Sequence, residues 1–157
     1  MANRPRKYPP LETYLRIKKW CDLRERCQSE VRSKLYDWGL YSDEVENMIA
    51  RLISDNYLDE SRFASAYVSG KYRIKHWGRN RIVRELKQRD ISSFNINAAL
   101  KEIDEQEYLR ILDYLKERKE ELMDEGIREF ERNGKVARFL INRGFEPDLV
   151  WERINRG

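Results

Sequence analysis

Three segments of the chain share one order of apolar residues, and this internal repeat constrains the fold more than any other feature. They read SEVRSKLYDWGLYSDEVENMI, NRIVRELKQRDISSFNINAAL and GKVARFLINRGFEPDLVWERI. Leu35, Leu86 and Leu140 occupy the same place in the three segments, each about fifty residues after the last. Because repeats of this period belong to arrays of tandem units, we expect three copies of one structural unit.

A turn divides each segment into two helical stretches. The turn position holds Gly39, Asp90 and Gly144, and glycine is favoured where a helix ends in a left-handed backbone conformation. Aspartate at position 90 departs from glycine, but it tolerates that conformation better than most residues do. A longer helix precedes each segment. In the middle unit its apolar stripe, which predicts the buried face, consists of Phe63, Ala66, Tyr67, Gly70, Ile74 and Trp77.

The pattern predicts an all-α protein of three tandem three-helix repeats that form an elongated, curved array. The expected divisions are a mobile basic arm over residues 1–10 and repeats over residues 11–58, 59–103 and 104–157. A unit of about fifty residues buries little apolar surface by itself, so neighbouring units share their stability. The chain has no heptad seam, so we expect a monomer, and its extended surface favours a large partner over a small substrate.

Motifs of catalysis, metal binding and membrane insertion are missing from the sequence. Cys21 and Cys27 lack zinc-ligand spacing and His76 is the only histidine, so two reduced thiols packed on helices are expected. No glycine-rich phosphate loop, nucleophile elbow or paired-histidine motif is present. The beginning, MANRPRKYPP, lacks the apolar stretch of a secretion signal, and no apolar run could span a membrane. We therefore expect a non-enzymatic cytoplasmic protein without catalytic residues, metal or cofactor.

Charge is segregated along the chain. The net charge is +4, from 32 lysines and arginines and 28 acidic residues. Residues 1–34 and 59–90 are basic, whereas residues 35–58 and 101–133 are acidic. From Lys71 to Arg84 the chain carries six bases and no acid. This alternation indicates a shaped electrostatic surface rather than a uniformly basic coat.

The basic middle segment supplies the candidate binding residues. Contacts to a partner or to DNA phosphates are expected from Arg62, Lys71, Arg73, Lys75, Arg79, Arg81, Arg84 and Lys87. Tyr72 lies off the apolar stripe and is the candidate for base stacking, whereas Trp77 ends the stripe and is expected in the core. Glu85 is the single acid among five bases from position 79 to 89, so pairing within that helix cannot neutralise them. Arg79 lies in the first helical turn, where the helix dipole disfavours a cation, and it therefore indicates an outside anion.

Structural explanations stay open for the same residues. Asp59 precedes Arg62 by three positions, so it could cap the helix and also hold the arginine as an internal pair. The row of Arg81 and Arg84, with Lys87 beside it, could be a solvated helix face without a partner. By itself, the basic segment does not distinguish nucleic acid from an acidic groove on a protein.

Five short elements between residues 56 and 91 occur together in one known family. They are Tyr57-Leu58-Asp59, Arg62-Phe63-Ala64, the helix start Gly78-Arg79, Glu85-Leu86 and Asp90-Ile91. In this combination the sequence resembles the RecX family of bacterial recombinase regulators, which also has three tandem three-helix repeats in a chain of this size. The resemblance covers roughly residues 11–155, and the middle unit carries most of it. Asp90 stands where the family usually has glycine.

The resemblance implies a protein that binds the RecA recombinase, chiefly as its filament on single-stranded DNA. Such proteins lie along the filament groove and inhibit recombination, ATP hydrolysis and co-protease activity, which implies a role in DNA repair and the SOS response. Binding to DNA alone is expected to be weak and non-specific, because phosphate contacts depend on counterion release. Two alternatives stay open: a helix-turn-helix-like nucleic-acid-binding protein without RecA dependence, and a scaffold without DNA dependence.

Overall fold

The structure, a computed structural model, describes residues 5–156, and within that range the chain forms nine α-helices and no strand. None of these helices is both long enough and apolar enough to cross a membrane. They are α1 (Pro10–Leu23), α2 (Gln28–Asp37), α3 (Ser42–Ser54), α4 (Glu60–Arg73), α5 (Arg79–Gln88), α6 (Ser93–Leu100), α7 (Glu105–Glu121), α8 (Glu129–Asn142) and α9 (Pro147–Arg156).

Local chemistry explains where several helices begin and end. The Asp59 carboxylate accepts a hydrogen bond of 2.9 Å from the backbone N–H of Arg62, which satisfies a free donor in the first turn of α4. At the ends of α2, α5 and α8 the chain turns through left-handed backbone conformations. The φ angles there are 84° at Gly39, 59° at Asp90 and 103° at Gly144, which confirms the predicted turns.

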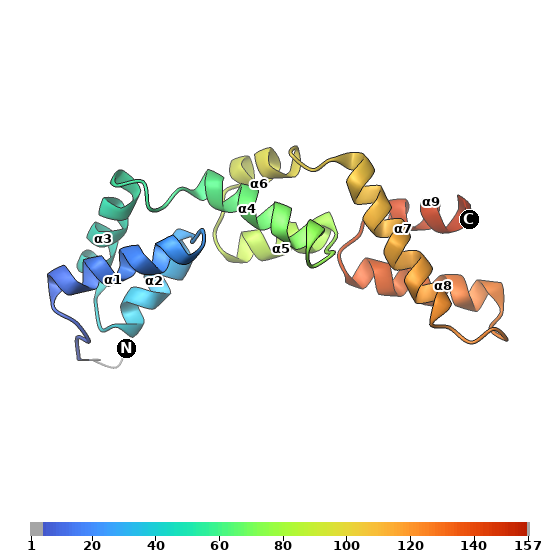
Figure 1. Cartoon of the computed structure of the whole chain (residues 1–157), viewed down its shortest axis with the longest axis horizontal. Coiled ribbons are helices and arrows are strands. Elements are labelled where there is room, and N and C mark those ends of the chain that lie inside the picture. Colours follow the sequence, from blue (N-terminus) through green and yellow to red (C-terminus); the bar gives the residue numbers. More distant parts are fainter. Residues whose placement is uncertain (1–4, 157) are drawn as a thin grey trace.

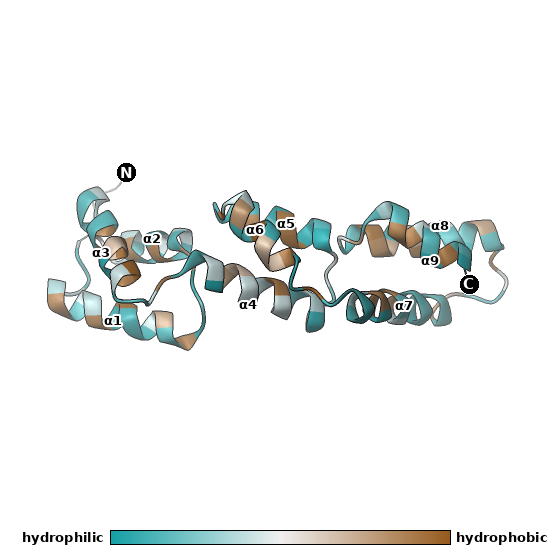
Figure 2. Cartoon of the chain, turned by 90° about the horizontal axis from the view of Figure 1, so that it is seen from above, coloured by the Kyte–Doolittle hydropathy of each residue, from teal (hydrophilic) through white to brown (hydrophobic). Residues whose placement is uncertain are grey.

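The helices form three groups in a row, so the molecule is elongated and curved (Figure 1). The groups are α1–α3, α4–α6 and α7–α9. Seen from above, the first helix of each group lies along one side of the molecule and the other two lie along the opposite side (Figure 2). The predicted all-α array of three tandem three-helix repeats is therefore confirmed.

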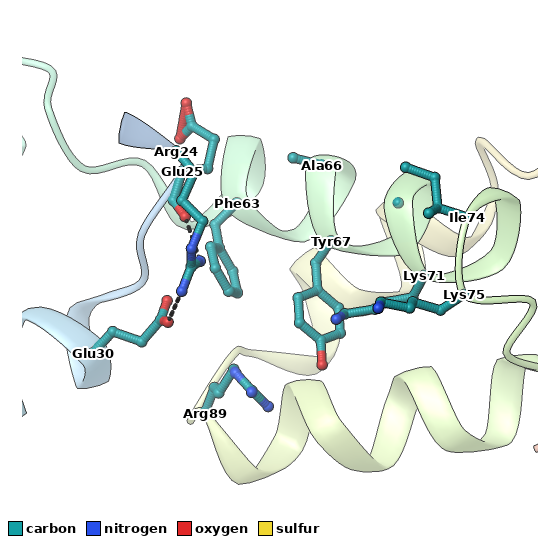
Figure 3. Close-up of a pocket in the computed structure, with 11 residues that line it drawn as sticks. Arg24, Glu25, Glu30, Phe63, Ala66, Tyr67, Lys71, Ile74, Lys75 and Arg89 are labelled. Atoms are coloured by element: carbon teal, nitrogen blue, oxygen red, sulfur yellow. Dashed lines mark hydrogen bonds and ion pairs between the residues drawn. The ribbon is translucent and has the colours of Figure 1, made fainter. Parts of the chain in front are cut away.

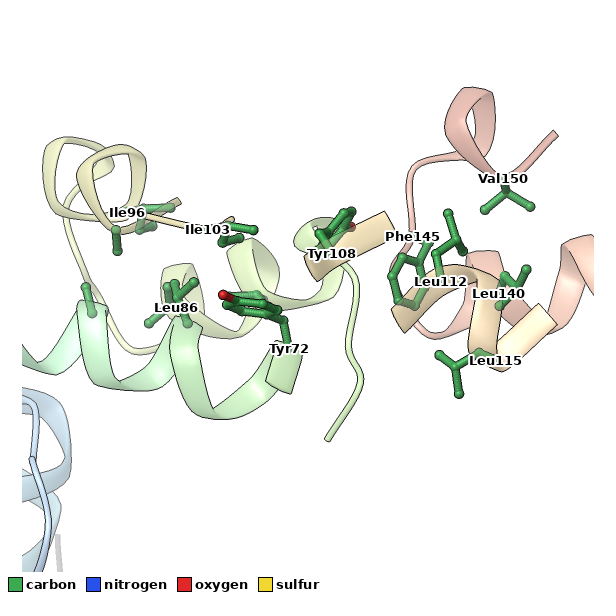
Figure 4. Close-up of a cluster of buried hydrophobic side chains, with 14 of the residues drawn as sticks. Tyr72, Leu86, Ile96, Ile103, Tyr108, Leu112, Leu115, Leu140, Phe145 and Val150 are labelled. Atoms are coloured by element: carbon green, nitrogen blue, oxygen red, sulfur yellow. The ribbon is translucent and has the colours of Figure 1, made fainter. Parts of the chain in front are cut away.

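The buried apolar residues form two clusters. One lies within the first group. The other runs without a break from the second group into the third and also includes Cys27 from the start of α2. Figure 4 shows this second cluster, with Tyr72 and Leu86 on one side, Leu112 and Leu140 on the other, and Tyr108 between them. The second and third groups thus share one core, so we expect them to unfold together. The three aligned leucines are fully buried: Leu35, Leu86 and Leu140.

The expected mobile arm over residues 1–10 is wrong for its described part. The backbone N–H of Lys7 donates to the Trp38 carbonyl at 2.9 Å, and the Tyr8 ring meets the Trp38 ring edge-on with centroids 5.3 Å apart. The chain at Pro5 passes close to Gly39, and a Cβ added to Gly39 would collide with the Pro5 carbonyl oxygen. These contacts hold residues 5–9 against the first group, and α1 begins at Pro10. Residues 1–4 lie outside the described residues.

The buried face of α4 also differs from the predicted stripe. Phe63 is buried and Trp77 packs against the core as expected, but Ile74 is 76% exposed. The core instead takes Val68 and Tyr72, which are each 2% exposed. Helix α4 carries apolar residues on more than one face, and its packing on α5 and α6 selects which face is covered.

Candidate functional surface

The basic residues that were predicted to bind a partner divide into two groups. Three are held by other side chains of this chain: Arg62, Arg73 and Arg79. The other five have no carboxylate partner among residues 5–156 and form what we call the cationic surface: Lys71, Lys75, Arg81, Arg84 and Lys87. Only the second group has charge that is free for an outside partner.

Arg62 ties the first helical group to the second. Its Nε donates to Glu25 Oε1 at 2.6 Å, and its two terminal nitrogens donate to the side-chain and backbone oxygens of Asn56, each at 3.1 Å. Asp59 caps the helix but is not the partner of the guanidinium. All three guanidinium nitrogens are used internally, so Arg62 is a structural residue rather than a partner contact.

The expected stacking role of Tyr72 is wrong, because its ring lies in the core. Tyr72 is 2% exposed, and its hydroxyl donates to Glu107 Oε1 at 2.7 Å. Arg73 Nε donates to the same carboxylate oxygen at 2.8 Å. The hydrogen bond from Arg73, followed by that from Tyr72, lowers the pKa of Glu107. These contacts join α4 to the first turn of α7 and leave no face of the Tyr72 ring for a base.

Arg79 finds its anions inside the molecule, so the inference of an outside anion at this position is wrong. Its Nη1 donates to Glu146 at 2.9 Å, and Nη2 pairs with Glu105. The guanidinium lies over the Tyr108 ring, 4.0 Å from the centroid, and only 21% of the side chain is exposed. Burial lowers the pKa of Arg79, but the hydrogen bonds to Glu146 and Glu105 outweigh it, so the pKa is raised.

The backbone around Gly78 completes the junction between the second and third groups. The N–H of Gly78 donates to the Arg143 carbonyl, and the N–H of Asn80 donates to the Gly144 carbonyl, both at 2.9 Å. A Cβ on Gly78 would collide with the backbone of Gly144 and Phe145. The turn at 143–146 is thus held directly against the start of α5, which fixes the orientation of the residues that α5 carries.

The cationic surface lies on α5, on the last turn of α4 and on the segment that follows α4. Arg84 and Lys87 are exposed on α5. Arg81 lies 4.0 Å over the Trp77 ring, and Lys71 approaches the same ring from α4 at 4.7 Å, so one tryptophan links the two helices. Stacking restricts Arg81 while leaving its guanidinium nitrogens free to donate, and this arrangement suits the recognition of phosphate or carboxylate groups.

The bases at the edge of this surface repel one another. Burial, followed by the charge of Lys75, lowers the pKa of Lys71. Burial, followed by the charge of Arg81, lowers the pKa of Arg143. Arg143 is held by the backbone carbonyls of Lys75 and His76, to which its guanidinium donates. Because these cations raise one another's energy, an anion placed among them would be stabilised.

The sequence did not reveal the carboxylates that hold the structural arginines. Glu105, Glu107 and Glu146 lie 26 to 67 residues from the arginines that they bind, and no spacing rule connects them. Arg143 was also missed, because it follows a helix that reads as ordinary core. Within residues 5–156, no three histidine, cysteine, aspartate or glutamate side chains are grouped so that they could hold a metal ion.

Comparisons with known proteins agree with this architecture. Residues 59–100 match the family described as RecX, second three-helix domain. The regulatory protein RecX of Pseudomonas fluorescens is 34% identical over 130 residues, which cover 81% of this chain and 79% of that protein. That of Pelodictyon phaeoclathratiforme is 30% identical over 132 residues, covering 84% of this chain and 78% of the relative. A crystal structure of RecX from Lactobacillus salivarius has the same fold, with a TM-score of 0.82 at 18% identity, over 94% of this chain and 95% of that one. The chain therefore belongs to the RecX family of regulatory proteins.

Proposed function

We propose that this protein is a non-enzymatic regulator that binds the RecA recombinase as its filament on single-stranded DNA. Binding inhibits recombination, ATP hydrolysis and co-protease activity, and so limits recombination and the SOS response in the bacterial cytoplasm. Membership of the RecX family supports the regulatory role. The observation that carries the proposal is the cationic surface, which presents unpaired bases on the rigidly held helix α5.

The shape of the molecule is suited to this role. A filament presents the same subunit surface again and again, and an elongated array can contact several subunits at once (Figure 1). One bound molecule would then hinder the conformational cycle of more than one recombinase subunit. Inhibition is therefore expected at fewer than one molecule for each RecA subunit.

A helix-turn-helix protein without RecA dependence is the second candidate. Helix α5 exposes Asn80 and Gln88 beside its bases, and such side chains can read base edges in a DNA groove. However, Ile82 and Leu86 face the core and most of the remaining exposed side chains are cations. This composition favours phosphate contacts over base reading, so weak and salt-dependent DNA binding is expected.

The test measures ATP hydrolysis by RecA on single-stranded DNA, with increasing amounts of the purified protein. We expect the rate to fall while RecA is still in excess. An unchanged rate with the protein in excess over RecA would show that the proposal is wrong. Tight, sequence-selective binding to duplex DNA at physiological salt would instead support the helix-turn-helix candidate.

A further inference from the structure

A groove lies between the first and second helical groups, on a face of α4 that no other helix among residues 5–156 covers (Figure 3). Its volume is about 440 Å³. Phe63, Ala66, Gly70 and Ile74 line its apolar part, and Tyr67 points into it from the same helix. These residues belong to the apolar stripe that was expected to be core. The stripe is present on α4, but part of it lines the groove and does not lie in the core.

The residues on the open face of α4 are small or exposed. Ala66 is exposed, Ile74 is 76% exposed, and a Cβ added to Gly70 would meet no heavy atom within 4 Å. Glycine inside a helix is less favourable than alanine, and no contact within the described chain requires it here. Alanine and glycine one helical turn apart let a second helix approach the backbone of α4 closely.

The walls of the groove are cationic. Arg24 pairs with Glu30 at 2.8 Å, and Arg62 holds Glu25, so the two acidic residues of the groove already have partners. Lys71 and Lys75 line the groove without a carboxylate partner among residues 5–156. An occupant with apolar side chains and at least two carboxylates would therefore complement the groove.

A protein segment fits this groove better than a nucleic acid does. Bases stack on open aromatic faces, but the Tyr67 ring is already covered by cations, with Lys71 at 5.2 Å and Arg89 at 5.1 Å from its centroid. The same ring also packs against Phe63 and Trp77. What remains open is a hollow with an aliphatic floor, which accepts leucine-like side chains rather than flat bases.

We propose that the α4 groove binds an acidic, amphipathic helix of a protein partner, which inserts apolar side chains over Gly70 and pairs its carboxylates with Lys71 and Lys75. The inference rests on the proposed function in that it takes the recombinase as this partner. It assigns protein contacts to the groove and to Lys71 and Lys75, which the groove shares with the cationic surface, and it leaves the bases of α5 for other anions.

The test places a reporter cysteine in the groove. Cys21 and Cys27 are buried, and burial raises the pKa of Cys21 to about 11, so these thiols are expected to react slowly near neutral pH. An Ala66→Cys variant would carry one reactive thiol in the groove, and an Ala98→Cys variant would carry one on exposed α6 as the matched control. Alkylation by iodoacetamide is measured alone, with poly(dT), and with RecA assembled on poly(dT).

We expect the filament to slow alkylation of the Ala66→Cys thiol by about tenfold and that of the Ala98→Cys thiol much less, since a docked helix excludes the reagent. Poly(dT) by itself should protect neither. Protection by poly(dT) alone would assign the groove to nucleic acid, and protection that grows with protein concentration would assign it to a second copy of this chain. Either result would overturn the proposal, as would an unprotected Ala66→Cys thiol in a protein that binds the filament.

A second variant tests the groove by filling it. Gly70→Leu should weaken filament binding by about tenfold or more while leaving poly(dT) binding unchanged, because the leucine occupies the space of the partner helix. Gly134→Leu is the control, since Gly134 lies inside α8 with nothing within 4 Å of its Cβ position. If both variants bound the filament equally well, the groove assignment would be wrong and the proposed function would be unaffected. A wild-type protein that fails to bind the filament would refute the proposed function and this inference together.

Discussion

At the scale of single residues, two glycines on the second helical group have opposite surroundings. A Cβ on Gly78 would collide with the backbone of the third group, whereas one on Gly70 would enter open space. We expect Gly78→Ala to destabilise the protein by about 3 kcal/mol or more, since neither backbone can yield without breaking the junction. Gly70→Ala should stabilise it by about 0.5–1 kcal/mol through helix propensity. Urea unfolding followed by circular dichroism measures both, and equal effects would contradict the described packing.

Two arginines of α5 separate structural from functional charge. Arg79 bridges the exposed Glu105 and the partly buried Glu146 and covers Tyr108, so Arg79→Ala leaves both carboxylates without their cation. We expect a loss of about 2 kcal/mol in the free energy of unfolding. Arg84 is exposed and has no carboxylate partner in the described part of the chain, so Arg84→Ala should change stability by less than about 0.5 kcal/mol. Equal shifts of the denaturant midpoint for the two variants would show that the ion pairs of Arg79 with Glu105 and Glu146 do not stabilise the fold.

At the scale of the element, α5 presents three bases that can be removed without replacing a buried residue. Replacement of Arg81, Arg84 and Lys87 by alanine should retain helicity, because Ile82 and Leu86 hold the helix and alanine is a good helix former. If each exposed contact contributes under about 1 kcal/mol, inhibition of RecA should weaken by about five- to a hundredfold. The ATP hydrolysis assay gives the magnitude.

The control removes the same formal charge elsewhere. Lys101, Arg110 and Arg118 are exposed and lie outside the cationic surface, so their replacement by alanine should have little effect. Equal losses from the two triple variants would show that net charge governs binding. Full inhibition by the α5 variant, with unchanged circular dichroism, would show that this row of bases is only a solvated face.

At the scale of the whole molecule, the row of three helical groups predicts the solution shape. We expect small-angle scattering to report an elongated particle with the mass of one chain, because the groups meet end to end (Figure 1). The continuous core of the second and third groups further suggests that they resist proteolysis as one body. Scattering from a compact sphere of monomer mass would contradict this description.

The repeat and its helices could be read from the sequence because they depend on neighbours in the chain. Leu35, Leu86 and Leu140 are buried by helical periodicity, and Gly39 and Gly144 end helices through their own backbone freedom. These are short-range effects, so one chain was enough to predict the all-α array.

Only the tertiary structure decided which charges and which apolar faces are available. From the sequence, Tyr72 and Arg79 were predicted to contact a partner. In the structure, Glu107 of α7 lies beside Tyr72, and Glu105 of α7 and Glu146 of the turn before α9 lie beside Arg79. The stripe that contains Gly70 was predicted to lie in the core. In the structure the first group does not cover it, and its residues line an open groove. Both outcomes depend on contacts between residues far apart in the chain. The spacing of residue types along the sequence does not specify which surfaces pack against each other.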